Sequence, residues 1–145
     1  CSGTAYNMHN QLIWPLFVMS LLSLLVWLRL FQTRIGEMKR RQIHPQLAAL
    51  SAQTGQFEDT RAADNFRNLF ELPVLFYLAI LLAIHTNIEN VVLLVLAWAF
   101  VALRFLHSYI HCTYNRVKDR FTAYLFGGIA LWALWVILAY QLLLR

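Results

Sequence analysis

Four polar residues recur at short intervals just before an apolar stretch of the sequence: Asp64, Arg67, Asn68 and Glu71. In a helix, residues three or four positions apart lie on one face, so Asp64, Asn68 and Glu71 share a face and Arg67 sits one turn before Glu71. A carboxylate beside an apolar run is costly in a membrane unless it is paired or hydrated. Glu71 is therefore either paired with Arg67 and Asn68 in a structural polar cluster of the bundle, or part of a binding site.

A second polar stripe comes later in the chain. Arg104, His107 and His111 lie three and four residues apart, and Arg120 precedes Tyr124 by about one helical turn. A lone arginine at a helix start is usually an interfacial anchor. Anchoring alone does not require a carboxylate, an amide and two histidines at similar depth in three helices, and this convergence favours a binding pocket.

Such a pocket, to which Arg34 at the end of the first apolar stretch can add a cation, suits a small zwitterionic ligand with several carboxylates. Two other interpretations stay open. The polar cluster can serve assembly in a non-catalytic membrane binding or accessory protein. His107 and His111 can also be ligands of a metal or haem, although a haem bundle usually needs a histidine on a facing helix and His85 lies at the opposite membrane face.

The elements that must position these residues are membrane helices. The 145 residues are 60% hydrophobic and 13% charged, which is too apolar for a soluble domain of this size. We expect an all-α four-helix bundle in one domain, 1–145, with 1–8 as a disordered or non-native N-terminal segment. Four stretches approach the roughly 17 to 25 residues that a bilayer helix needs. These predicted spans are 12–31, 69–84, 91–106 and 123–144.

The ends of the helices follow from local signals. The first helix is expected to start near Gln11, to run to about Arg41 and to stay in the mature protein, because no basic segment precedes it. The second is expected to begin near Asp59 or Thr60 and to bend at Pro73, which removes a backbone hydrogen bond. The short links at 86–90 and 115–119 predict antiparallel neighbours.

The charges predict the orientation of the chain. The net charge is +5, and ten of the twelve Lys and Arg residues fall within 34–67 or 104–120. Both ranges flank alternate connections, so the positive-inside rule places loops one and three in the cytoplasm and both termini outside. Because topology accounts for these cations, no nucleic-acid role is needed.

The motifs resemble those of the MAPEG family, the membrane-associated proteins of eicosanoid and glutathione metabolism. The run Arg67-Asn68-Leu69-Phe70-Glu71 with Pro73 is similar to the family's Asn-x-x-Glu signature near a proline on helix two. Arg104-x-x-His107 followed by Arg120-x-x-x-Tyr124 is similar in order and spacing to the glutathione-binding residues of the synthases. The resemblance covers nearly the whole chain from Met8.

The resemblance implies a homotrimer with sites between subunits and glutathione as co-substrate. Arg120 would hold the sulfur as thiolate, and the binding residues would be Arg34, Arg67, Asn68, Glu71, Arg104, His107, His111 and Tyr124. The implied activity is that of a glutathione transferase or peroxidase acting on lipophilic electrophiles from the bilayer.

Three residues depart from the eukaryotic pattern. His111 stands where the eukaryotic synthases carry a tyrosine, Asp64 where they carry an arginine, and Phe121 where the prostaglandin synthase has a serine. Asp64 weakens the electrostatic case for a glutathione carboxylate nearby. The sequence around His107 and His111 is closer to that of bacterial members, which implies a bacterial inner membrane and leaves the electrophile unassigned.

Overall fold

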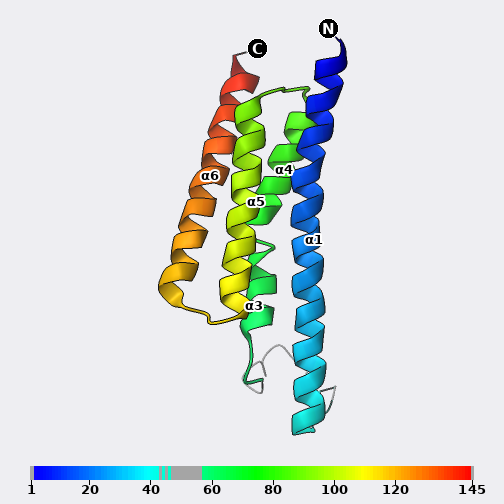
Figure 1. Ribbon diagram of the computed structural model, residues 1–145, viewed down its shortest axis with the longest axis vertical. Coiled ribbons are helices and arrows are strands. Elements are labelled where there is room, and N and C mark those ends of the chain that lie inside the picture. Colours follow the sequence, from blue (N-terminus) through cyan, green and yellow to red (C-terminus); the bar gives the residue numbers. More distant parts are fainter. Residues whose placement is uncertain (1, 43, 45, 47–56, 145) are drawn as a thin grey trace.

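The computed structural model describes residues 2–42, 44, 46 and 57–144, and every regular element within these ranges is a helix. The helices run side by side in one elongated bundle (Figure 1). Both termini lie at one end, together with the α4–α5 link, and the α5–α6 link lies at the other. The elements are α1 (Ser2–Arg41), α3 (Arg61–Asn68), α4 (Leu72–His85), α5 (Val91–Cys112) and α6 (Val117–Leu143).

Within the described ranges, four helical segments are long and apolar enough to cross a membrane: Asn10–Arg41, Arg61–His85, Val91–Cys112 and Val117–Leu143. Large apolar side chains cover much of the outer surface, among them Trp14, Phe17 and Trp132. Water disfavours such a surface, whereas lipid accommodates it. The predicted all-α bundle with four membrane-length helical segments is confirmed.

The first helix begins earlier than expected. It starts at Ser2 rather than near Gln11, so it includes residues 2–8, for which the sequence suggests a disordered or non-native segment. Its end at Arg41 agrees with the prediction.

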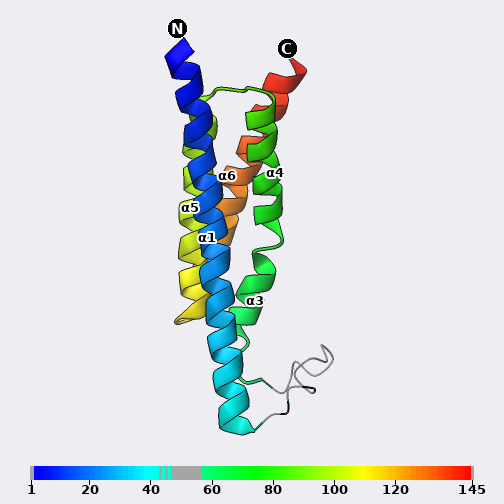
Figure 2. The same ribbon diagram turned by 90° about the vertical axis from the view of Figure 1, so that its right-hand side faces the viewer.

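The second predicted helix is broken rather than bent. α3 ends at Asn68 and α4 begins at Leu72, and the two follow one another along the same side of the bundle (Figure 2). Pro73 lies in the first turn of α4, where the missing N–H is tolerated, but a continuous helix would need that N–H to bond to Leu69. The chain therefore turns at residues 69–71, and this turn carries Glu71.

Apolar side chains form the centre of the bundle. The rings of Phe76 on α4 and Phe100 on α5 stack with their centroids 4.8 Å apart. Met19 on α1 and Leu131 on α6 are fully buried against the same core. Packing of this kind fixes the axial register of the helices, and so the depth of their polar residues.

Each of the two short links contains an asparagine at which the chain reverses direction. Asn87 and Asn115 adopt left-handed backbone conformations, with φ of 53° and 48°, which asparagine tolerates better than most residues. The Asn90 side chain accepts a hydrogen bond from the Val92 N–H at 2.8 Å and caps α5. The α5–α6 link occupies 113–116, slightly earlier than the predicted 115–119, because α6 begins at Val117.

Candidate functional site

A cavity of about 280 Å³, here called the polar cavity, lies near the end of the bundle that carries the α5–α6 link. Three regions of the chain supply its walls: the α3–α4 junction, α5 and the first turns of α6. It brings together five of the residues singled out in the sequence. Its lining consists of Asn68, Glu71, His107, Val117, Arg120, Phe121 and Tyr124.

Glu71 reaches this cavity because of the helix break. It is the N-cap residue of α4, and its side chain is exposed rather than enclosed in the apolar core. Asn68 is the last residue of α3, so the turn presents an amide and a carboxylate to the same space. This arrangement gives Glu71 access to polar surroundings that an uninterrupted membrane helix would not offer.

Arg120 is held in place by two side chains from the end of α5 and the following link. Its Nη1 donates to Asn115 Oδ1 at 2.7 Å and lies 3.4 Å from His111 Nε2. Because a guanidinium only donates, that His111 nitrogen acts as the acceptor. The cation at the cavity is therefore oriented by the turn at Asn115, and the remaining N–H groups of Arg120 are available to a ligand.

One ring nitrogen of His107 is hydrogen-bonded, and the other has no hydrogen-bond partner among the described residues. Its Nδ1 lies 3.2 Å from the carbonyl oxygen of Arg120, which can only accept, so Nδ1 carries the hydrogen. In the neutral ring, Nε2 is then an acceptor, and it has no hydrogen-bond partner among the described residues. The ring centroid is 5.9 Å from that of Tyr124, so the imidazole and the phenol stand together at the cavity wall.

Arg104 lies behind this wall. It is 1% exposed, and its guanidinium carbon is 5.0 Å from the Tyr124 ring centroid and 5.3 Å from that of Phe100. None of its three side-chain nitrogens has a hydrogen-bond partner in the described part of the chain. A buried cation without a hydrogen-bonded anion creates a positive potential, which an anion in the cavity would relieve.

Four predicted site residues do not line the polar cavity of their own chain: Arg104 lies behind its wall, His111 contacts Arg120, and Arg34 and Arg67 lie elsewhere. Arg67 is exposed on α3. The Arg34 guanidinium carbon lies 3.9 Å from the centroid of the Phe57 ring, where α1 meets the segment that leads into α3. Two of the residues that depart from the eukaryotic pattern lie nearby. Asp64 is half-buried on α3, whereas Phe121 lines the cavity and is 61% exposed.

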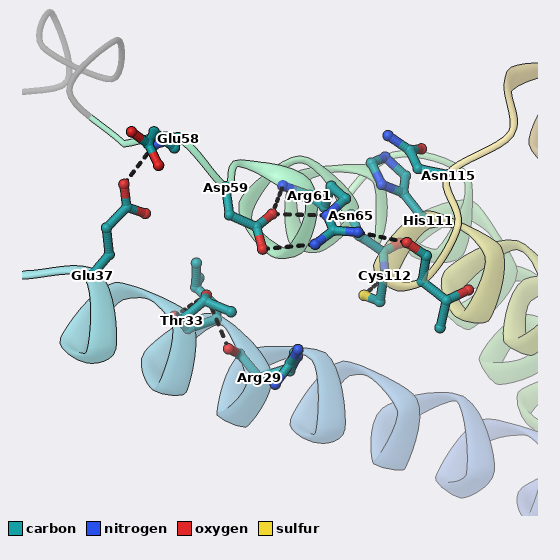
Figure 3. A network of polar contacts seen from close by, with 12 residues as sticks. Arg29, Thr33, Glu37, Glu58, Asp59, Arg61, Asn65, His111, Cys112 and Asn115 are labelled. Atoms are coloured by element: carbon teal, nitrogen blue, oxygen red, sulfur yellow. Dashed lines mark hydrogen bonds and ion pairs between the residues drawn. The ribbon is translucent and has the colours of Figure 1, made fainter. Parts of the chain in front are cut away.

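A polar clamp that the sequence interpretation missed joins α3 to the end of α5 (Figure 3). Arg61 binds Asp59 with two hydrogen bonds, Nε to Oδ1 at 2.9 Å and Nη2 to Oδ2 at 3.0 Å. Its Nη1 donates to the Thr113 carbonyl at 2.5 Å. The Arg61 guanidinium holds the pKa of the Asp59 carboxyl below its ordinary value, against the opposite effect of partial burial.

One turn further along α3, Asn65 makes a second connection to α5. It is fully buried, its Oδ1 accepts from the Ser108 hydroxyl at 3.2 Å, and its Nδ2 donates to Cys112 Sγ at 3.5 Å. The only signal for it in the sequence is the four-residue step from Arg61 to Asn65. Together with the clamp, it fixes α3 relative to the turn that orients Arg120.

The histidine pair offers no complete metal site within the described ranges. The centroids of the His107 and His111 rings are 5.8 Å apart, and no group of three or more His, Cys, Asp or Glu residues in those ranges is arranged to hold a metal ion. His85 ends α4, at the far end of the bundle from the pair.

Comparison with known proteins identifies the family. The model of the MAPEG family matches residues 12–140, most of the chain and every residue of the polar cavity. No curated protein and no solved structure matches the chain. On the strength of the family match, the chain belongs to the MAPEG family.

Proposed function

We propose that this protein is a membrane-bound glutathione-dependent transferase or peroxidase that acts on lipophilic electrophiles from the bilayer. The observation that carries the proposal is the position of Arg120, which lines one cavity with Asn68, Glu71, His107 and Tyr124 and is oriented by Asn115. Membership of the MAPEG family, which includes glutathione transferases, supports the choice of glutathione.

The charges at the polar cavity match those of glutathione. Its ammonium group would pair with Glu71, and its peptide groups would hydrogen-bond to Asn68, since both residues line the cavity. Its carboxylates would be drawn by the positive potential of Arg104. Asp64 is a half-buried carboxylate on the same helix as Asn68, and we expect the glutathione carboxylates to avoid that side.

The proposed chemistry depends on the state of the sulfur. A thiol with a pKa of about 8.5 is mostly protonated at neutral pH. The Arg120 guanidinium beside the sulfur would stabilise the thiolate, which is the nucleophile. In a transferase reaction, the thiolate forms a carbon–sulfur bond to the electrophile as the leaving group departs with its electron pair. Tyr124 lines the same cavity and can donate a hydrogen bond to the developing anion.

We also propose a homotrimer with glutathione sites between subunits. At about 280 Å³, the polar cavity is slightly smaller than the roughly 300 to 1,000 Å³ typical of ligand pockets. Arg34 and Arg67 do not line it in their own chain. A neighbouring subunit that covers the cavity would enlarge its walls and can bring further cations to the ligand, and native mass spectrometry of the detergent-purified protein measures the number of chains.

The test is a thermal-shift titration with glutathione, followed by conjugation of a generic aryl halide. We expect stabilisation and turnover for the wild type, and loss of most turnover in Arg120→Ala. Arg116→Ala is the matched control, because Arg116 is exposed one turn earlier and does not line the polar cavity. Arg120→Ala turning over like the wild type would make the thiolate role wrong.

The other outcomes separate the alternatives. Stabilisation by glutathione without turnover of aryl halides or organic peroxides would identify a binding or accessory protein. If the protein shows no stabilisation by glutathione and no turnover, glutathione is not its co-substrate. A Soret band in the absorption spectrum of the purified protein would instead favour haem bound through His107 or His111.

A further inference from the structure

A second cavity, here called the α1–α5 groove, lies between α1 and α5 and has a volume of about 430 Å³. It is separate from the polar cavity, because Ser108 lines this groove whereas its neighbour His107 lines the polar cavity. Most of its surface is apolar. The lining residues are Leu22, Leu25, Val26, Arg29, Phe105, Ser108, Tyr109, Cys112 and Thr113.

One cation stands at the end of this groove nearest the α5–α6 link. Arg29 is the only Lys or Arg in the first 33 residues of the sequence, and it falls within a helical segment that is long and apolar enough to cross a membrane. The Arg29 side chain is exposed and lines the groove together with Thr113, the residue that follows the end of α5, so an anion can reach it. Figure 3 places Arg29 on α1, on the side that faces Asp59, Asn65 and Cys112.

The nearby carboxylates are already engaged with other cations. Asp59 interacts electrostatically with Arg29, but its two oxygens accept the hydrogen bonds of Arg61. Further along α1, Glu37 accepts from the Glu58 N–H at 2.6 Å and from Arg41 at 3.2 Å. Two guanidinium groups therefore share one carboxylate at this end of the groove, and the local charge is positive.

The Ser108 and Thr113 hydroxyl groups of the groove are also engaged, whereas Tyr109, which lines the groove too, offers a phenol but no cation. Ser108 donates to Asn65 at 3.2 Å, and the Thr113 hydroxyl donates to the Tyr109 carbonyl at 2.6 Å. Arg29 is left as the group in the groove that can bind an anion strongly. The remaining walls offer apolar contact from Leu22 and Val26 on α1 and from Phe105 on α5.

We propose that the α1–α5 groove binds a single-chain anionic amphiphile of the long-chain fatty-acid class. Its carboxylate pairs with Arg29 in a charge-assisted contact, and its chain runs along Leu22, Val26 and Phe105 toward the middle of the bundle. A volume of about 430 Å³ is near the lower end of the range for small-ligand pockets, which favours one chain over a diacyl lipid. The site is independent of the proposed glutathione chemistry.

Native mass spectrometry in an uncharged detergent tests this proposal with three separate probes: palmitate, the corresponding alcohol and phosphatidylglycerol. We expect saturable binding of one palmitate per chain and about tenfold weaker binding to R29Q. R29K, which keeps the charge, should retain most of the affinity. Lys39→Gln is the control, because Lys39 is an exposed cation on the same helix that does not line the groove.

Several results would overturn the proposal. Equal palmitate binding by wild type and R29Q would remove the carboxylate contact. Equal affinity for palmitate and its alcohol would show that charge plays no part, and preferential retention of phosphatidylglycerol would identify a bilayer lipid as the occupant. The bulky variant Val26→Trp should block palmitate and leave the glutathione thermal shift unchanged, so failure here is distinguishable from failure of the proposed function.

Discussion

At the scale of single residues, the main feature is that the arginines of the chain differ in their hydrogen-bond partners and in their burial. Arg61 is bound on both sides by Asp59 and the Thr113 carbonyl, and Arg120 is oriented by Asn115. Arg104 is 1% exposed, lies against the rings of Phe100 and Tyr124, and has no hydrogen-bond partner among the described residues. Residues that keep an unfavourable buried charge are candidates for function rather than stability.

Replacing Arg104 with methionine separates these two roles. Met has a similar length and no charge to desolvate, so we expect Arg104→Met to leave the melting temperature unchanged or to raise it. Because the positive potential beneath the polar cavity disappears, glutathione should bind about tenfold more weakly. Calorimetry gives the affinity, and Arg116→Met is the exposed control. A large loss of stability with normal glutathione binding would show that Arg104 is structural.

The Asp59–Arg61 pair predicts a pH dependence. The folded-state pKa of Asp59 is lowered by its hydrogen bonds from Arg61, so its stabilising effect is present above the unfolded-state pKa and is lost as the pH falls through the folded value. We expect Asp59→Asn to lower stability at neutral pH by about 1 kcal/mol or less, because both side chains are partly exposed. Thermal melts should show this difference shrinking below about pH 4. A difference that stays constant with pH would rule out the ionised pair as its source.

At the scale of elements, the break between α3 and α4 builds the site. Residues 69–71 leave the helix, and this turn carries Glu71 to the polar cavity directly after Asn68. The clamp at Arg61 and the buried Asn65 hold α3 against α5 on the other side of the break. The short helix α3 is therefore a separate element held by its own hydrogen bonds, rather than the end of a longer helix.

The variant Pro73→Ala tests the importance of the break. Alanine restores a backbone N–H and favours helix, so we expect α3 and α4 to become more continuous and Glu71 to leave its position at the cavity. Glutathione affinity should fall about tenfold without loss of melting temperature. Pro15→Ala is the control, since Pro15 lies inside α1 near the opposite end of the bundle. Unchanged affinity would mean that residues 69–71 keep their turn without the proline.

At the scale of the whole molecule, the polar cavity, the clamp and the α5–α6 link all gather near one end of the bundle, and both termini lie at the other (Figure 1). The basic residues follow the same division, because the link 86–90 near the termini carries no Lys or Arg. This asymmetry is the basis of the predicted orientation, with the site reached from the cytoplasm.

Cysteine labelling in intact cells measures that orientation. In a Cys1→Ser, Cys112→Ser background, Asn87→Cys should react with a membrane-impermeant maleimide from outside, whereas Arg116→Cys should react only after permeabilisation. Both positions are exposed in the two short links, so accessibility to water is matched. Labelling of Arg116→Cys alone in intact cells would reverse the orientation and place the polar cavity near the outer surface.

Sequence patterns alone were enough to predict the class of the molecule and the residues of its two polar stripes. Hydrophobic length predicted the four membrane-length segments, and steps of three and four residues placed Asn68 with Glu71 and Arg104 with His107 and His111. These patterns are local, because they depend on helical periodicity and on the thickness of the bilayer. The family resemblance, carried by the same residues, agrees with the family match.

Which of these residues share a cavity, and which lie behind its wall, depends on how the helices pack. Periodicity gives a face of a helix but not its rotation against a neighbour, so Arg67 could not be separated from Asn68, nor Arg104 from His107. The contacts of Arg61 with Thr113 and of Asn65 with Ser108 join positions far apart in the chain, so helical periodicity cannot predict the partners. Helix packing and the break before Pro73 set these distances, and both depend on side chains contributed by other helices.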